Sequence, residues 1–408
     1  SGWGRLTPQY QNLFRAYTTT NSIIKKATAR HPQLSIIDWA AISDQLDLTA
    51  DGIHLNGPGI TRYSTLVRDI VVGATKRLAA GTTTKFHLGG LASLPAETTA
   101  VGLQVSIDNP RTSGGLTVWP CSAQRPLAPN FSWAVGEAVS GTLVAPLDEL
   151  GDTCLWQSAD ARLSVRLVGA FTPTAGYSYH RNSRTLVPLI GTATATVPIL
   201  PGVFAPTTVL AEITGAAGGT PMAYRVFNCG DNQAIPTVTS FPRGSSTVLA
   251  LIQTNSEGAV CVRSSGGGKA SITVVGTFED SGAAAAAVRV FDSRTPVVAS
   301  RSTAIQVSGV AHLPAAGSFS GALSVVTAGF PSDPGRLTGG PCPASNMSPR
   351  LALLEPHHPR SAMILAPIDG TNGRFCIAAS AATTMTVDVL GIFLTGFTSL
   401  GPTALRNG

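Results

Sequence analysis

The six cysteines constrain this fold more than any other feature of the sequence. They fall into three pairs, separated by 33, 32 and 34 residues: Cys121 and Cys154, Cys229 and Cys261, Cys342 and Cys376. An even count at a repeated spacing predicts a repeated unit with one internal disulfide in each copy. Closing a loop of this size contributes roughly 3–4 kcal/mol in the chain-entropy view. The alternative is unpaired core thiols, whereas disulfides imply an oxidising compartment.

The sequence around the cysteines repeats as well. After the second cysteine of each pair, an alternating apolar run ends in Gly-x-Phe, at residues 169–171, 276–278 and 391–393. Before that cysteine, a short apolar run leads into a polar, glycine-containing turn and back, which predicts a β-hairpin.

These repeats predict a mainly β fold. The chain holds 43 Gly and 28 Pro, which favours turn-rich strands over helices. Alternation such as Ile272, Thr273 and Val274 fits half-buried strands of a sandwich. We predict three tandem disulfide-bearing β-sandwich domains, preceded by an incomplete α/β segment over residues 1–80. Their expected ranges are 81–175, 176–283 and 284–396, with a tail over 397–408.

Three short motifs carry a resemblance to a known kind of repeat: "GGLTVWPC" (residues 114–121), "DSRTP" (292–296) and "VDVLGIF" (387–393). The units resemble tandem β repeats of secreted actinobacterial proteins, which run from an Arg-x-x-Asp-Thr-Arg-like start through G-x-L-T-V-x-P-C to D-V-x-G-Y-F. The resemblance implies an exported, surface-associated accessory module without known chemistry. The first unit lacks the Ser-Arg-Thr element.

Residues 1–80 follow a different pattern. Thr7 and Pro8 are typical of a helix start, and residues 34–40, "LSIIDWA", read as a buried parallel strand. Residues 59–78 place apolar side chains on one helical face. One strand and two helices cannot close an α/β core. We therefore expect this segment to pack on a partner segment or on the repeats.

The loop "ADGIHLNGPG", residues 50–59, offers a candidate catalytic pair. Asp51 can hold the imidazole of His54 in the tautomer that a general base needs. The segment resembles the C-terminal end of SGNH/GDSL-type hydrolases, where D-x-x-H-L precedes the last helix. The resemblance implies a serine esterase or acyltransferase with His54 as base and Asp51 as its partner.

The nucleophile of that family has no place in this sequence. No Gly-Asp-Ser block and no Gly-x-Ser-x-Gly is found. Asp292 and Ser293 belong to the repeat element instead. We expect the chain alone to be inactive, with the serine on a missing N-terminal hydrolase segment or another subunit. The start at Ser1, without Met, favours a processed or truncated N-terminus.

Composition argues against several other classes of function. The net charge is +6, but the basic residues are scattered and no nucleic-acid motif is present, so no nucleic-acid partner is expected. No apolar run reaches the length of a membrane span. The pair His357–His358 lies between prolines without a third ligand nearby, so neither a metal nor another cofactor is predicted.

Three functions remain in view. The first is an exported cell-surface or extracellular protein that joins an esterase remnant, acting on acyl groups of a carbohydrate or cell-wall glycan, to three β modules. The second is a structural surface protein, a self-assembling fibre or an adhesin subunit, with homo-oligomers as partners. The third is a glycan-binding module with Trp119, Trp133 and Trp156 as a stacking face, although core packing is the competing interpretation of these rings.

Overall fold

The computed structural model describes residues 76–404 apart from short internal gaps (residues 92–93, 109, 128, 137–138, 181–183, 190–192, 218–222, 231–237, 240–244, 267, 280–281, 300, 343–349, 355 and 358). The chain divides into two compact units, Ser1–Ala74 and Thr75–Gly408, and the strands and sheets below all belong to the second. Asp51 and His54 lie outside the described residues, so their pairing stays a prediction.

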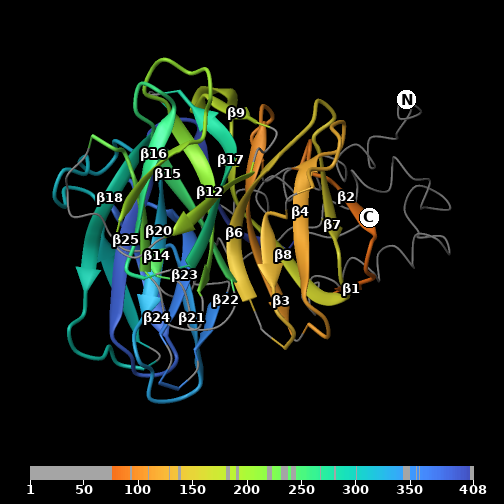
Figure 1. Ribbon diagram of the computed structural model, residues 1–408. Coiled ribbons are helices and arrows are strands. Elements are labelled where there is room, and N and C mark those ends of the chain that lie inside the picture. The colour runs from red at the N-terminus through yellow and green to blue at the C-terminus, as the bar shows by residue number, and fades with distance from the viewer. Residues whose placement is uncertain are drawn as a thin grey trace, which may run out of the picture. The chain divides into compact units, whose positions relative to one another are not determined.

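Strands make up the regular structure of the described residues. The one exception there is a single 3-10 turn, η1 (Pro173–Ala175), and the same residues contain no α-helix. The prediction of a mainly β fold is confirmed, and the described strands pair antiparallel (Figure 1). No helix in the described part of the chain has the length and apolar character to cross a membrane.

The first sandwich has eight strands in two sheets, with the orders β1-β8-β3-β6 and β2-β7-β4-β5. Taken along the chain, this is strand order 1-8-3-6 facing 2-7-4-5, the order of a jelly roll. The strands are β1 (Lys76–Leu78), β2 (Thr83–His87), β3 (Ala100–Asp108), β4 (Gly114–Pro120), β5 (Phe131–Trp133), β6 (Val139–Pro146), β7 (Asp152–Gln157) and β8 (Ala161–Phe171).

The second and third sandwiches have the same strand order, β10-β17-β12-β15 with β11-β16-β13-β14, and β18-β25-β20-β23 with β19-β24-β21-β22. The second comprises β10 (Arg184–Leu189), β11 (Thr194–Pro198), β12 (Thr208–Ala217), β13 (Ala223–Phe227), β14 (Val238–Thr239), β15 (Ser245–Gln253), β16 (Ala259–Ser264) and β17 (Gly268–Phe278). The third comprises β18 (Ala283–Asp292), β19 (Ser302–Gln306), β20 (Gly321–Ala328), β21 (Gly335–Gly340), β22 (Arg350–Leu354), β23 (Arg360–Pro367), β24 (Arg374–Ala379) and β25 (Met385–Phe393).

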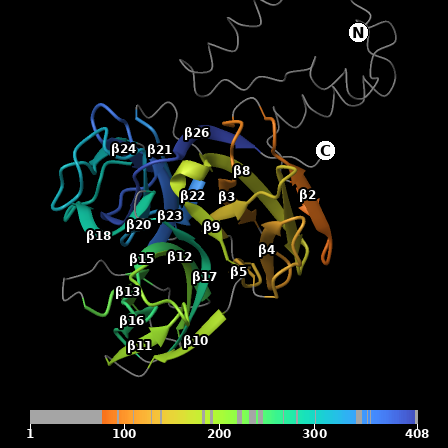
Figure 2. The same ribbon diagram turned by 90° about the horizontal axis from the view of Figure 1, so that it is seen from above.

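The last strands of the three jelly rolls meet at their ends. The ring centroid of Phe171 lies 5.2 Å from that of Phe393 and 6.0 Å from that of Phe278, and the latter two are 5.7 Å apart. The repeated Gly-x-Phe therefore places three buried rings around one local threefold axis. Figure 2 shows the three sandwiches grouped around this common centre. In each roll we call the sheet that holds the Phe strand the axial sheet, and the other sheet, which holds the second cysteine, the disulfide sheet.

Each Phe strand also receives a strand from the preceding jelly roll. β9 (Tyr177–Tyr179) follows the first roll and pairs with β17, and the start of β18 follows the second roll and pairs with β25. β26 (Phe397–Ala404) follows the third roll and returns to β8 of the first. The register is the same in all three places, because Tyr177, Ala283 and Phe397 each lie opposite a Phe. The three rolls therefore form a closed ring, which β26 completes.

Two sequence expectations are wrong in this fold. Residues 59–78 were expected to be helical, yet Lys76–Leu78 is strand β1, paired with β8. The predicted α/β segment over residues 1–80 therefore does not extend to its end, because hydrogen bonding to a sheet edge overrides the helical pattern there. The hairpin before each second cysteine is also wrong: β6 pairs with β3, whereas β7 pairs with β2 and β4 in the opposite sheet.

The connection from β6 to β7 is an arch across the sandwich. Gly151 has a φ of 75°, and its carbonyl accepts the N–H groups of Leu88 and Gly89 at 2.9 and 3.0 Å. Gly258 and Gly373 repeat this arrangement in the other rolls, each with positive φ and each accepting two N–H groups. A left-handed residue whose Cβ would meet the neighbouring backbone requires glycine, which explains the recurring glycine of the turn.

Candidate functional site

The disulfides join equivalent strands in all three jelly rolls. They are Cys121–Cys154, Cys229–Cys261 and Cys342–Cys376, with Cα separations of 5.0, 4.9 and 5.2 Å. Each links the end of the fourth strand to the seventh strand of the disulfide sheet, as the cysteine spacing predicted. The solvent-exposed surface next to each disulfide is equivalent in the three rolls. In the first roll this surface carries a cluster of ionisable side chains.

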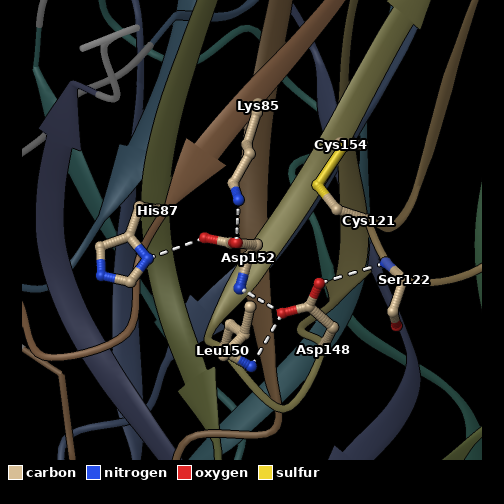
Figure 3. A network of polar contacts seen from close by, with 8 residues as sticks. All are labelled: Lys85, His87, Cys121, Ser122, Asp148, Leu150, Asp152 and Cys154. Atoms are coloured by element: carbon tan, nitrogen blue, oxygen red, sulfur yellow. Dashed lines mark hydrogen bonds and ion pairs between the residues drawn. A yellow bond between two sulfur atoms is a disulfide. The ribbon is translucent and has the colours of Figure 1, made fainter.

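Asp152 is a buried carboxylate at this face, and β2 provides its two cationic partners. Alternation in β2 points Lys85 and His87 to solvent, and the register places His87 directly opposite Asp152. The Nδ1 atom of His87 lies 2.7 Å from Oδ1 of Asp152, and Nζ of Lys85 forms an ion pair with the other oxygen. Asp152 is 1% exposed, so the two side chains cover it (Figure 3).

A second carboxylate ties this pair to the disulfide. Asp148, in the arch before β7, accepts the backbone N–H groups of Leu150 and Asp152 on Oδ1 at 3.0 and 2.9 Å. Its Oδ2 accepts the N–H of Ser122, the residue after Cys121, at 3.1 Å. Two carboxylates therefore fasten β2, the arch and the loop after β4 to one another (Figure 3).

The charges of this network support one another. Burial raises the pKa of Asp152, but the hydrogen bonds from Lys85 and His87 outweigh burial and hold that pKa below its usual value. The same contact raises the pKa of Lys85. The pair is therefore ionised at neutral pH, and each partner stabilises the charge of the other.

The His87–Asp152 pair resembles a general base with its orienting acid, but none of its contacts in the described residues is with a serine or cysteine nucleophile. The contacts of His87 in the described part of the chain are with Asp152, and all six cysteines are in disulfides. The described residues contain no group of three or more His, Cys, Asp or Glu side chains suited to a metal ion. What the described contacts do is hold β2, the arch and the loop after β4 in place.

The ion pairs of Asp152 are not repeated in the described residues of the other two rolls, although Asn255 and Asp369 accept backbone N–H groups of their arches as Asp148 does. Lys85 pairs in register with Cys154, and the corresponding residues opposite Cys261 and Cys376 are Thr196 and Ala304. The residues at the position of Asp152 are Ala259 and Arg374 in the second and third rolls, opposite Pro198 and Gln306. The ion pairs are thus specific to the first roll, while disulfide, arch and axial ring recur in each.

The three tryptophans form no continuous open platform. Trp119 and Trp133 are 5% and 3% exposed, and Trp133 belongs to the core of the first sandwich. Trp156 is half-buried, with the guanidinium carbon of Arg125 3.8 Å from its ring centroid. A stacking site for sugar on this face would therefore depend on Trp156 alone and would compete with Arg125.

Comparison of the sequence with known proteins identifies no family. No protein-family model and no curated protein matches the chain. Among solved structures, a protein of the Sulfolobus Turreted Icosahedral Virus is 7% identical over 50% of this chain and 88% of that chain, with a TM-score of 0.25. A triple jelly-roll protein of an archaeal virus is 9% identical over 79% and 84%, with a TM-score of 0.21. Tandem CBM22 domains of Paenibacillus barcinonensis are 11% identical over 54% and 94%, with a TM-score of 0.15. The jelly-roll assignment rests on the strand order of this chain.

The resemblance to an SGNH/GDSL hydrolase followed by actinobacterial repeats is wrong. The described residues are antiparallel sheets with one 3-10 turn and no α-helix. The motif D-x-x-H-L is short, and its meaning depends on an α/β context that the described chain does not provide. Lys85, His87 and Asp152 were missed because 65 residues separate His87 from its partner and only the strand register brings them together.

Proposed function

We propose that this chain is a structural building block of an extracellular assembly and acts without catalysis. The observation that carries the proposal is the closed ring of three jelly rolls, completed by β26 on β8. A chain that joins three equivalent sandwiches around one axis presents three similar outer faces. This architecture favours a subunit of a coat, a fibre or an adhesin over an enzyme with a substrate cleft.

The division between repeated and unrepeated positions supports this proposal. Disulfide, arch glycine and axial Phe occur in every roll, and each of them holds backbone or core in place. The ion pairs of Asp152 with Lys85 and His87 have no counterpart among the described residues of the other two rolls. Selection for a shared catalytic or ligand-binding role would repeat the chemistry, whereas a shared architectural role requires only the scaffold to repeat.

We place the protein outside the cell, at a surface or in the medium. Three disulfides persist in an oxidising compartment and are rare where glutathione keeps thiols reduced. Each bond closes a loop of about 33 residues and contributes roughly 3–4 kcal/mol to stability in the chain-entropy view.

The partner that we propose is a second copy of this chain. Edge strands present unpaired N–H and C=O groups, and charged side chains on an edge oppose pairing with another sheet. The first roll has Lys85 and His87 on its edge strand β2, whereas the edge strands β11 and β19 carry no charged residue. The second and third rolls are therefore the proposed contact surfaces between copies.

Sedimentation velocity and negative-stain electron microscopy test the proposal. The native chain should form concentration-dependent, regular assemblies. The double variant Thr196→Lys/Ala304→Lys places a lysine where the first roll has Lys85, at two exposed positions, and should remain a folded monomer. As a matched control, Thr83→Lys on the edge that already carries charge should assemble like the native chain. A native chain that stays monomeric at all concentrations would refute the assembly.

A further inference from the structure

Glu212 is a carboxylic acid buried between the first and second jelly rolls. It lies in β12 and is 3% exposed. The Nδ2 group of Asn130, in the segment before β5 of the first roll, donates a hydrogen bond of 2.9 Å to its Oε1. Asn130 is itself 3% exposed, and its Oδ1 accepts the N–H of Val118 at 2.7 Å. The contact therefore connects the backbone of one roll to a central strand of the next.

Among the described residues, no positively charged side chain contributes to the pKa of Glu212. Within its own sheet it lies between Leu249 of β15 and Thr273 of β17. The titratable group coupled to it in the described part of the chain is Tyr177 of β9, whose hydroxyl donates to the carbonyl of Val275 at 3.3 Å. Burial raises the pKa of Tyr177 far above neutrality, so this ring stays uncharged. Ion pairs in the same described residues do not include Glu212.

The packing of the three jelly rolls does not require an acidic residue at the position of Glu212. The register positions equivalent to Glu212 are Gln104 in β3 and Val325 in β20, because all three lie opposite corresponding residues of the Phe strands. Both equivalents are neutral and are 2% and 1% exposed. The fold is therefore satisfied by a neutral side chain here, and the carboxylic acid adds a property that packing alone does not require.

We propose that the Glu212–Asn130 contact is a proton-controlled latch, which holds the first and second jelly rolls together while Glu212 is protonated and loosens when Glu212 ionises. A neutral carboxyl accepts the hydrogen bond of Asn130 in an apolar interface. A carboxylate at the same place would accept a hydrogen bond from Asn130 but would have no counter-ion among the described residues. Because an uncompensated buried charge is strongly unfavourable, ionisation destabilises the closed interface. This inference does not depend on the proposed assembly.

The direction of the pH effect follows from linkage. Burial raises the pKa of Glu212 to about 8, and the hydrogen bond from Asn130 lowers it only in part. In the opened interface the group returns to an ordinary pKa of about 4.3. Between these two values opening releases one proton, so the equilibrium constant for opening rises about tenfold per pH unit. Acidification therefore tightens the latch, and the effect levels off above the folded pKa.

Hydrogen exchange followed by mass spectrometry tests the latch on the full-length chain. After correction for the intrinsic exchange rate, the opening constants of amides in β4, β5 and β12 should rise by about two orders of magnitude from about pH 5 to about pH 7.5. In Glu212→Gln, which mimics the protonated acid, this rise should disappear. Glu257→Gln changes an exposed glutamate of the same roll and should behave like the native chain. Amides of β20 and β24 serve as the internal reference.

Two results would overturn the latch. One is a Glu212→Gln chain that keeps the native pH dependence at β4, β5 and β12. The other is a native rise that is equally large in the third roll. If Glu212→Gln does not fold, Asn130→Asp decides, because it keeps the acceptor for Val118 and adds a second carboxyl. It should open the interface more than the native chain at neutral pH and recover at about pH 4, and native-like exchange at neutral pH would refute the latch.

Discussion

The backbone N–H of Thr172 donates a hydrogen bond of 2.8 Å to the carbonyl oxygen of Gly396, 224 residues further along the chain. Glu279 donates to Gly176 at 3.1 Å and Leu394 donates to Gly282 at 2.8 Å in the corresponding places. In each case the residue after an axial Phe bonds to the glycine that introduces the incoming strand. Two of these bonds join jelly rolls that follow one another in the chain, and the bond of Thr172 joins the first roll to the segment after the third.

Phe397 should be a major contributor to the stability of the ring. Its ring lies 5.1 Å from Phe171 and 5.1 Å from Phe393, and the residue is 4% exposed. We expect Phe397→Ala to lower the free energy of unfolding by about 3–5 kcal/mol, measured by urea denaturation. Phe330→Ala, at a residue 71% exposed, is the control and should change it by less than about 0.5 kcal/mol. Equal effects of the two substitutions would contradict the role of Phe397.

The three disulfides should stabilise the chain by similar amounts. Their loops differ little, with separations of 33, 32 and 34 residues, and loop length enters the unfolded-state entropy only as a logarithm. Replacing both cysteines of any one pair by alanine should lower the free energy of unfolding by about 2–5 kcal/mol. Calorimetry of the three double variants measures this, and a pair whose loss leaves the melting temperature unchanged would show that its bond is dispensable.

The arch glycines should tolerate substitution less well than other glycines of the same backbone conformation. Gly151 and Gly136 have φ values of 75° and 72°. A Cβ at Gly151 would lie 2.4 Å from Cα of Gly89, whereas a Cβ at Gly136 would meet no atom within 4 Å. Gly136→Ala should lower the free energy of unfolding by about 1 kcal/mol, because of the left-handed backbone conformation alone. Gly151→Ala should lower it clearly more, because the added Cβ also meets the backbone of Gly89. Chemical denaturation of both variants gives the comparison, and similar losses would argue against a tight arch.

The Asp152 network should make stability fall in acid. The folded-state pKa of Asp152 lies below the unfolded value, so its contribution is present above an unfolded pKa of about 3.9 and is lost as the pH falls through the folded value. Between about pH 5 and about pH 2.5, the melting temperature should fall less steeply for Asp152→Asn than for the native chain. Asp333→Asn, at an exposed position, should follow the native curve, and parallel curves for all three proteins would show that Asp152 does not cause the acid sensitivity.

The local part of this architecture could be predicted from sequence, because the features that build it are themselves repeated. Cysteine spacing predicted the three disulfides, and alternation around residues such as Ile272 predicted strands. The arch could not be told from a hairpin, since a polar turn with glycine between two apolar runs fits both. The difference depends on whether β7 pairs with β6 or with β4, and that is decided by strands elsewhere in the chain.

Contacts between distant segments escaped prediction for the same physical reason. The pairing of β26 with β8 and the contact of His87 with Asp152 depend on register between strands far apart in sequence. No local propensity encodes such a register. The helical pattern of residues 59–78 gave way at Lys76–Leu78 because the edge of β8 offers backbone hydrogen bonds there. The short motif around His54 suggests a family that the described chain does not support.

The closure of the ring is tested most directly by a disulfide across the strand pair that completes it. Ala170 of β8 and Thr398 of β26 are register partners, and Ser178 and Thr277 are the equivalent pair of β9 and β17. In Ala170→Cys/Thr398→Cys, peptide mapping of the oxidised monomer should find one additional intrachain disulfide that joins these two strands, as it should in Ser178→Cys/Thr277→Cys. Free thiols at residues 170 and 398, with the bond formed in the control pair, would contradict a ring closed by β26.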